Sequence, residues 1–178
     1  MTKLAFTFPG QGSQHIGMGK DFFDNFKEAR HTYEEANDVL SMDLSGLIFN
    51  SSKENLRKTE NTQPAILSTS IAILRCLEKE GISAKYSAGL SLGEYSSIVY
   101  GNGISFSDTI KIVRERGRFM QEAVPLGVGG MAAILGLEEE RLPLVVESAK
   151  NYGIVEIANY NSPGQIVISG ELKSVEIA

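Results

Sequence analysis

Residues 89–93 read Gly89-Leu90-Ser91-Leu92-Gly93, a Gly-x-Ser-x-Gly pattern. The stretch 85–90 before the serine is short and bounded by small residues, which predicts a buried strand, and 92–100 has helical periodicity. A strand followed directly by this pattern and a helix is the context in which the serine lies on a strained turn. Glycine on either side leaves room for the close backbone contacts of that turn. The sequence therefore predicts a nucleophile elbow at Ser91.

Ser91 is a candidate nucleophile because of its predicted place between strand and helix. The turn lifts its hydroxyl above the sheet and puts the backbone N–H of Leu92 at a helix start, where a developing oxyanion is stabilised. The alternative is a tight turn whose serine only caps the helix. A serine also needs a base, and the two histidines, His15 and His31, both precede it. Enzymes with this elbow place the histidine after the serine, so the expected base is missing from the chain as given.

Apolar spacing around the elbow predicts an α/β protein. Residues 3–8 read as a strand that runs into a glycine-rich loop at 9–14. Helical spacing is found at 20–40, 64–81 and 107–123, with a polar, broken segment at 41–63. Val124-Pro125 is expected to stop the last of these helices. We expect residues 1–125 to form an α/β-hydrolase-like core with a parallel sheet.

Residues 126–178 are expected to form a second subdomain. Gly127, Gly129 and Gly130 read as a linker, and the pattern that follows predicts strand, helix, strand and strand at 131–135, 138–151, 154–158 and 165–169. A β-α-β-β run is the first part of the split βαββαβ arrangement of ferredoxin-like domains. Ending there leaves a sheet edge unpaired, which native proteins usually cover or shorten. We therefore expect an incomplete ferredoxin-like subdomain and a truncated chain.

The composition excludes several classes of function. The chain has 178 residues, of which 42% are hydrophobic and 22% charged, and its formal net charge is -5 with no basic run, which argues against nucleic-acid binding. No apolar stretch reaches the ~18 residues of a membrane span, and the N-terminus lacks the features of a signal peptide, so we expect no membrane association and a cytoplasmic location. Cys76 is the only cysteine. It is expected to pack in the core, and no metal or other cofactor is expected.

Several blocks of sequence carry a resemblance to a known family. In chain order they are Phe8-Pro9-Gly10-Gln11-Gly12-Ser13-Gln14, Asn61-Thr62-Gln63-Pro64-Ala65, Gly89-Leu90-Ser91-Leu92-Gly93-Glu94-Tyr95-Ser96, Arg116-Gly117-Arg118-Phe119-Met120-Gln121-Glu122-Ala123-Val124-Pro125 and Asn159-Tyr160-Asn161-Ser162-Pro163-Gly164-Gln165. Together they are similar to the bacterial malonyl-CoA:acyl carrier protein transacylase family of fatty-acid synthesis. The resemblance covers the whole chain given. It implies that family members continue past Ala178, into a segment that holds the catalytic histidine.

The resemblance implies a role for each matched residue. Ser91 would take the malonyl group as an ester, and the backbone N–H groups of Gln11 and Leu92 would donate to the oxyanion. Arg116 would bind the malonyl carboxylate. That role also makes chemical sense, because a guanidinium offers two parallel donors that match a carboxylate and so selects against uncharged acyl groups.

Three further substrate contacts are expected from the matched blocks. Met120 lies one helical turn beyond Arg116 and would line the same pocket, although a helical methionine is more often part of a core. Gln63 and Asn161 fall near the expected cleft, with a helix-start amide and a turn-forming side chain as their alternatives. One position departs from the family pattern, because Leu90 stands where many relatives have histidine. This departure affects local hydrogen bonding and leaves the nucleophile assignment unchanged.

A basic cluster accompanies the predicted carboxylate-binding residue. Arg114, Arg116 and Arg118 lie on one expected helix, where the simplest reading is a solvated surface. The cluster is also a candidate docking surface for an acidic acyl carrier protein.

Different functions remain open at this stage. The first is an acyltransferase that moves a malonyl group from malonyl-CoA to Ser91 and then to the phosphopantetheine thiol of acyl carrier protein. The second is a serine hydrolase, a thioesterase or esterase, in which water replaces the thiol. Arg116 argues for the first, because a hydrolase of neutral esters does not need to hold a carboxylate. The third is a non-catalytic fragment that keeps the groove without the base. Without a histidine after Ser91, the chain given is expected to be a poor transacylase or none.

Overall fold

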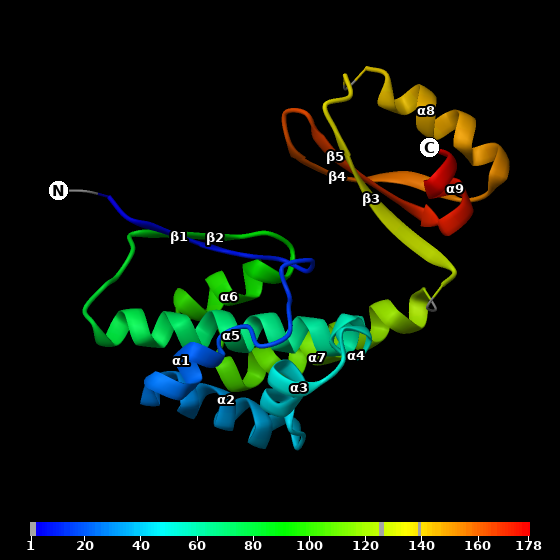
Figure 1. The fold of residues 1–178 in the computed structure, drawn as a ribbon. Helices are drawn as coiled ribbons and strands as arrows, with labels where there is room; N and C mark the ends of the chain where they lie inside the picture. Colours follow the sequence, from blue (N-terminus) through cyan, green and yellow to red (C-terminus); the bar gives the residue numbers. More distant parts are fainter. Residues whose placement is uncertain (1–2, 125–126, 139) are drawn as a thin grey trace. The chain divides into compact units, whose positions relative to one another are not determined.

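A mixed α/β architecture is seen in the computed structural model (Figure 1), which describes residues 3–124, 127–138 and 140–178. The chain folds as two units, Met1–Gln121 and Glu122–Ala178. The first contains a parallel pair of strands and the second an antiparallel sheet. Pro125, the predicted helix stop, and the predicted boundary after it lie outside the described residues.

The first unit is built on two parallel strands, β1 (Ala5–Phe8) and β2 (Tyr86–Gly89), in a register that runs from Ala5 opposite Tyr86 to Phe8 opposite Gly89. Parallel strands need a long crossover. Here the crossover consists of α1 (Lys20–Asn25), α2 (Lys27–Leu40), α3 (Leu44–Asn50), α4 (Lys53–Arg57) and α5 (Thr59–Lys79). After β2 the chain continues into α6 (Leu92–Tyr100) and α7 (Phe106–Ala123).

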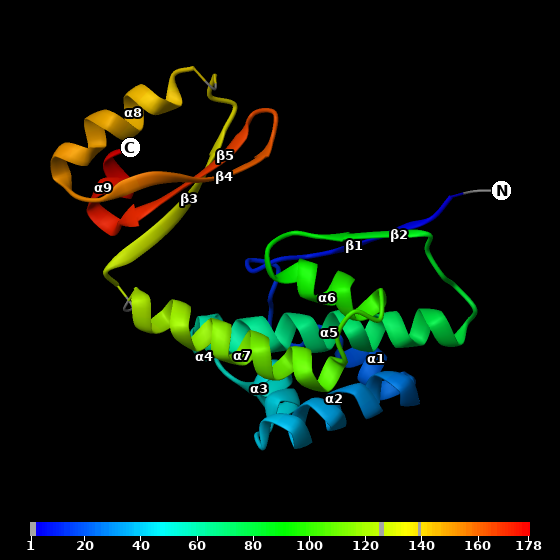
Figure 2. The ribbon, with the colours of Figure 1, turned by 180° about the vertical axis from the view of Figure 1, so that it is seen from behind.

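Helix α5 forms the centre of the first unit. Figures 1 and 2 show it running between the strand pair with α6 on one side and α1 to α3 on the other. Tyr33 of α2 is fully buried, and its hydroxyl donates to Thr69 Oγ1 on α5 at 2.9 Å. Burial raises the pKa of Tyr33 to about 12, so the hydroxyl remains a donor at neutral pH. Cys76 is buried in this core, as expected from the sequence.

The predicted helix at 20–40 is divided into α1 and α2 by Phe26, which has an extended backbone (φ -123°, ψ 126°). Arg30 explains how the break is tolerated, because its Nη2 donates to the carbonyl oxygens of Phe23 and Asp24 at the end of α1. These are carbonyls that a continuous helix would have used itself. The segment 41–63 is also more helical than predicted. Asp43 and Ser52 begin α3 and α4 by accepting hydrogen bonds from backbone N–H groups three residues later.

Helix α5 begins at Thr59, before Pro64, and not at the proline as predicted. A proline inside a helix has no N–H to donate to the carbonyl four residues earlier, here that of Glu60. In this structure the Glu60 carbonyl accepts from Arg114 Nη1 of α7 at 2.6 Å instead. The same Nη1 is 2.6 Å from Asn61 Oδ1. A tertiary contact with α7 therefore stabilises the first turn of α5.

The second unit is a three-stranded antiparallel sheet in the order β3-β5-β4, with helices on one face. Its elements are β3 (Gly129–Leu135), α8 (Leu142–Ala149), the short 3-10 helix η1 (Lys150–Tyr152), β4 (Val155–Ser162), β5 (Gln165–Glu171) and α9 (Leu172–Ile177). The predicted order of strand, helix, strand and strand is confirmed; residue 139, inside the predicted helix, lies outside the described residues. Apolar side chains of α8, such as Val146, pack against Ile166 and Ile168 of β5. Within the described chain, no helix is both long and apolar enough to cross a membrane.

Candidate active site

Ser91 lies on a strained turn between β2 and α6. Its φ of 52° and ψ of -102° fall outside the regions that residues other than glycine normally adopt. Ser91 is the residue before the first turn of α6, yet its side chain accepts no hydrogen bond from the helix. The reading of Ser91 as a simple helix cap is therefore wrong. The turn leaves the hydroxyl free to contact groups outside the helix.

The glycines of the elbow allow backbone segments to approach each other closely. A Cβ on Gly89 would collide with the backbone of Gly93, and a Cβ on Gly93 would collide with the carbonyl oxygen of Phe8 at the end of β1. The opposing atoms are backbone atoms, which cannot move aside as the end of a side chain can. The pattern Gly-x-Ser-x-Gly thus has a steric explanation in the fold.

Gly89→Ala is expected to lower the free energy of unfolding by about 2 kcal/mol or more, because overpacking against backbone forces the strand and helix apart. Chemical denaturation monitored by circular dichroism measures the change. Gly101→Ala is the matched control, since its Cβ would be 3.5 Å from the nearest atom, Ser97 O, and should change stability by less than about 0.5 kcal/mol. Equal effects of the two variants would contradict the packing argument.

Two backbone N–H groups next to Ser91 are available to a ligand. The loop after β1 lies against the elbow, because a Cβ on Gly10 would be 2.6 Å from Leu90 O. Gln11 follows in this loop, and Leu92 is the first residue of α6. Over residues 3–124, 127–138 and 140–178, neither the Gln11 nor the Leu92 N–H has a hydrogen-bond acceptor. Free N–H groups beside a serine hydroxyl are the donors that an oxyanion requires.

Arg116 of α7 contacts Ser91, the predicted nucleophile, directly. Its Nη2 donates to Ser91 Oγ at 3.2 Å and its Nη1 to Gln63 Oε1 at 2.8 Å. Gln63 Nε2 is 3.1 Å from Met120 Sδ. The structure therefore brings together Ser91, Arg116, Gln63 and Met120, all of which were predicted as site residues from the sequence.

Tyr95 is a member of this group that sequence reasoning missed as a site residue. The Arg116 guanidinium carbon lies 5.7 Å from the centre of its ring, within the range of a cation–π contact. The signal was present in the sequence, because Tyr95 follows Ser91 by one helical turn on α6 and so lies on the same side of that helix.

Arg116 differs from three other arginines of the first unit in having no acidic partner among the described residues. Arg75 pairs with Glu35 at 2.7 Å, Arg114 lies 3.9 Å from Glu60, and Arg118 pairs with Glu115 at 2.6 Å. Within the part of the chain that the structure describes, the Arg116 guanidinium contacts only Ser91, Gln63 and Tyr95, which are neutral. A positive charge that has no counter-ion among the described residues and lies beside a candidate nucleophile is suited to an anionic substrate group.

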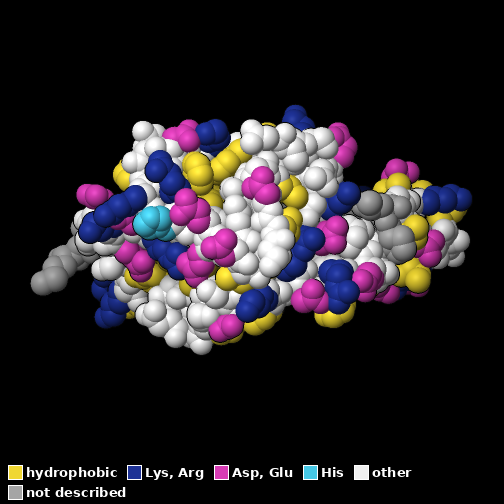
Figure 3. Space-filling view, turned by 90° about the horizontal axis from the view of Figure 1, so that it is seen from below, with side chains coloured by type: hydrophobic (Ala, Val, Ile, Leu, Met, Phe, Trp, Pro, Cys, Tyr) yellow, Lys and Arg dark blue, Asp and Glu magenta, His cyan; other side chains and the backbone are white. Residues whose placement is uncertain are grey.

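The predicted basic cluster does not form one surface. Arg114 donates to the first turn of α5, Arg116 faces Ser91, and Arg118 pairs with Glu115 on its own helix. On the face seen in Figure 3, lysine and arginine are interspersed with aspartate and glutamate. The hypothesis that these arginines form a docking surface for an acidic carrier stays a prediction.

The remaining candidates have hydrogen-bond partners of their own or are exposed, and the structure gives them no bond to this group among the described residues. His15 Nδ1 is 3.4 Å from Ser13 O, and His31 is exposed on α2; neither bonds to Ser91 in the described ranges. Asn161 belongs to β4 of the second unit, where its Nδ2 donates to Gln165 Oε1 at 3.2 Å, so its substrate contact stays a prediction. No cluster of three or more potential metal ligands occurs among the residues described.

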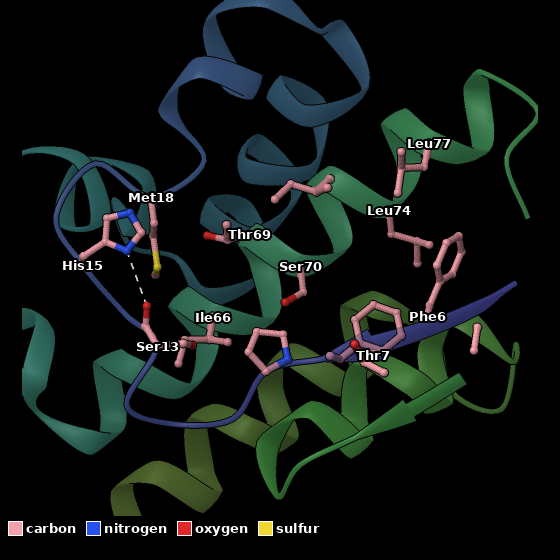
Figure 4. A pocket seen from close by; sticks show the side chains of 14 residues that line it. Phe6, Thr7, Ser13, His15, Met18, Ile66, Thr69, Ser70, Leu74 and Leu77 are labelled. Carbon is pink, nitrogen blue, oxygen red and sulfur yellow. Dashed lines mark hydrogen bonds between the residues drawn. The ribbon is translucent and has the colours of Figure 1, made fainter. Parts of the chain in front are cut away.

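A separate cavity of about 480 Å³ lies between β1 and α5 (Figure 4). It is lined mostly by apolar side chains such as Phe6, Ile66 and Leu74, with His15 and Met18 at one end. Ser91 and Arg116 are not among its lining residues. The cavity therefore does not contain the predicted nucleophile.

The sequence and the fold of this chain match those of known acyltransferases. Residues 5–177 match the acyl transferase domain family, and the chain belongs to that family. It is 50% identical over 179 residues to the malonyl CoA-acyl carrier protein transacylase of Bacillus subtilis strain 168, covering 100% of this chain and 56% of the relative.

Solved structures give the same result. The malonyl CoA-acyl carrier protein transacylase from Clostridium perfringens superimposes with a TM-score of 0.89 at 51% identity, over 99% of this chain and 56% of that one. A malonyl-transacylase in complex with its type II PKS acyl-carrier protein has a TM-score of 0.92 at 44% identity, over 99% of this chain and 57% of that one. The chain thus spans a little over half the length of the relatives it matches.

Proposed function

We propose that this chain provides the nucleophile and the acyl-selecting group of a malonyl-CoA:acyl carrier protein transacylase of fatty-acid synthesis. The observation that carries the proposal is the hydrogen bond of 3.2 Å from Arg116 Nη2 to Ser91 Oγ, made by a guanidinium without an acidic partner in the described chain. This contact supports the proposal because it puts a cation beside the oxygen that would carry the acyl group, within reach of a carboxylate on that group. The names of the relatives, malonyl CoA-acyl carrier protein transacylases, agree with a carboxylated acyl group.

The proposed reaction has two half-reactions. Ser91 Oγ attacks the thioester carbonyl of malonyl-CoA, the N–H groups of Gln11 and Leu92 donate to the oxyanion, and the C–S bond breaks to release CoA. The phosphopantetheine thiol of acyl carrier protein then attacks the Ser91 ester and frees the serine. The family resemblance assigns the proton transfers to a histidine that family members carry beyond the stretch matched here. The chemistry needs no metal or other cofactor, and none is proposed.

Arg116 also has a role in the absence of substrate. Its Nη2 donates to the Ser91 hydroxyl oxygen, and an incoming malonyl carboxylate is a stronger acceptor than a neutral hydroxyl. The carboxylate would therefore take over the guanidinium and release the Ser91 oxygen. Met120, whose sulfur contacts Gln63, would line the part of the site that holds the acyl chain of the malonyl group.

We further propose finer assignments for the fold and location. The first unit is α/β-hydrolase-like, a proposal supported by the parallel pair β1–β2 and the strained φ of 52° at Ser91. The second unit is part of a ferredoxin-like domain, supported by the strand order β3-β5-β4. A cytoplasmic location belongs to the same proposal, because the proposed donor and acceptor are the carriers of bacterial fatty-acid synthesis.

Transfer from malonyl-CoA to phosphopantetheinylated acyl carrier protein by the full-length protein, which carries this chain and the histidine segment implied by the family resemblance, tests the proposed reaction. Intact mass of the carrier is expected to show a malonyl group on its thiol, because the second half-reaction needs a thiol acceptor. A carrier that lacks the phosphopantetheine arm is the control and should stay unmodified. Release of free malonate with no modified carrier would support the hydrolase alternative and contradict the proposal.

A further inference from the structure

Gln63 is the most deeply buried polar group of the site. Its side chain is inaccessible to solvent, whereas Arg116 and Met120 are partly exposed. Both ends of its amide are already used, since Oε1 accepts from Arg116 Nη1 and Nε2 approaches Met120 Sδ. An amide buried behind the guanidinium and engaged at both ends is better placed to orient Arg116 than to contact substrate.

The chemistry of the partners fixes the orientation of the Gln63 amide. A guanidinium has only donors, so the atom facing Arg116 must be the carbonyl oxygen. The NH₂ group then faces Met120, whose thioether sulfur is a weak acceptor. The negative end of a neutral dipole thus points at Arg116. The amide oxygen holds the guanidinium by a hydrogen bond and leaves its positive charge uncompensated. A carboxylate at the same position would neutralise that charge.

Packing around Gln63 restrains the Arg116 backbone as well. A Cβ on Gly117, the next residue, would be 2.6 Å from Thr59 O at the start of α5, so the two helices touch there backbone to backbone. Arg114 fastens the same turn of α5 through Glu60 O. Gln63 lies one turn further along α5. The close contact of α5 with α7 therefore sets the distance between Gln63 and Arg116.

We propose that Gln63 is a positioning and specificity-determining residue, which aims the Arg116 guanidinium at the Ser91 acyl group and leaves its charge uncompensated for a carboxylate. The inference rests on the proposed malonyl transfer. It gives Gln63 a role through Arg116 in place of the direct substrate contact predicted from the sequence. It also explains why a neutral residue serves here: glutamate has the same shape but would pair with Arg116 as an internal counter-ion.

Gln63→Glu tests the charge part of the inference. The variant is expected to lower kcat/KM for malonyl-CoA by about 30-fold or more, since the carboxylate of the substrate must compete with an internal one. The loss should appear mainly in KM for malonyl-CoA, because the carboxylate contact exists before as well as during the reaction. Acetyl-CoA, which lacks the carboxylate, should change by less than about threefold in kcat/KM.

Gln63→Met tests the positioning part without adding a charge. Methionine has a similar length and no strong acceptor, so Arg116 keeps its charge but loses its anchor, and malonyl selectivity over acetyl is expected to fall by about tenfold. Gln121→Glu is the charge control: Gln121 lies on α7, as Arg116 does, and its Oε1 accepts from Thr59 N. It should leave the ratio of malonyl to acetyl reactivity unchanged. Thermal unfolding of each variant checks that the fold is retained.

The outcomes separate this inference from the proposed function. If the full-length wild-type protein, which carries this chain together with the histidine segment implied by the family resemblance, shows no malonyl transfer, the proposed function itself is contradicted. A wild type that transfers malonyl, together with Gln63 variants that keep the wild-type malonyl-to-acetyl ratio, overturns only the role of Gln63. Equal losses for malonyl-CoA and acetyl-CoA in both variants would also overturn it, because a purely structural residue affects both substrates alike.

Discussion

Ser91→Ala is expected to abolish the covalent malonyl adduct completely while the protein remains folded. The substitution removes one oxygen atom, and the backbone of the elbow is set by Gly89 and Gly93, which pack against backbone atoms. The remaining oxyanion donors and the Arg116 guanidinium can still bind malonyl-CoA but cannot form an ester. Intact mass after incubation with malonyl-CoA measures the adduct, and circular dichroism checks the fold.

Ser96→Ala is the matched control for the nucleophile. Ser96 lies on the same helix, α6, and its buried hydroxyl has no hydrogen-bond partner in the described chain. Its removal should leave the adduct at the wild-type level. An adduct that persists in Ser91→Ala and disappears in Ser96→Ala would show that the elbow serine is not the nucleophile.

Arg116→Ala is expected to reverse the preference for a carboxylated acyl group. Arg116 is partly exposed in the substrate-free protein, and a bound acyl group would cover it further; truncating one partner of a buried hydrogen-bonded charge pair costs about 2–5 kcal/mol, which corresponds to a fall in malonyl transfer of roughly 30- to 4000-fold. Transfer of an acetyl group should be retained or increased, because acetyl-CoA has no carboxylate to hold. Steady-state kcat/KM values for the two thioesters provide the measurement.

A second arginine on the same helix controls for the loss of charge. Arg118 pairs with Glu115 and is about half exposed, so Arg118→Ala should affect malonyl and acetyl transfer equally and weakly. If Arg116→Ala also lowered both reactions to the same extent, Arg116 would be a structural residue and the carboxylate assignment would be wrong.

The elbow could be predicted from the sequence because its determinants are local. A short strand, two glycines and a helix leave few conformations for Ser91, and the structure confirms a positive φ at this residue. The start of α5 could not be predicted in the same way. The carbonyl freed by Pro64 accepts its hydrogen bond from Arg114, a residue more than fifty positions away. Short-range patterns contain no information about such a partner.

The sequence could predict which types of residue form the candidate site, but not which role each of them has. The sequence placed Arg114, Arg116 and Arg118 on one helix but gave no means of telling a structural arginine from a substrate-binding one. Their partners differ: a backbone carbonyl, the Ser91 hydroxyl and a glutamate. The burial of Gln63 behind Arg116 likewise depends on the packing of α5 on α7. Tertiary contacts decide these roles.

Peptide mapping of the malonylated protein tests the central claim most directly. The full-length wild-type protein is incubated with malonyl-CoA, quenched at low pH, digested and analysed by tandem mass spectrometry. The account predicts a malonyl ester on Ser91, and a parallel incubation with acetyl-CoA should give less modification of the same residue because Arg116 favours the carboxylated group. A malonyl group on a different residue, or no adduct at any residue, would contradict the claim that Ser91 is the nucleophile that forms the acyl-enzyme.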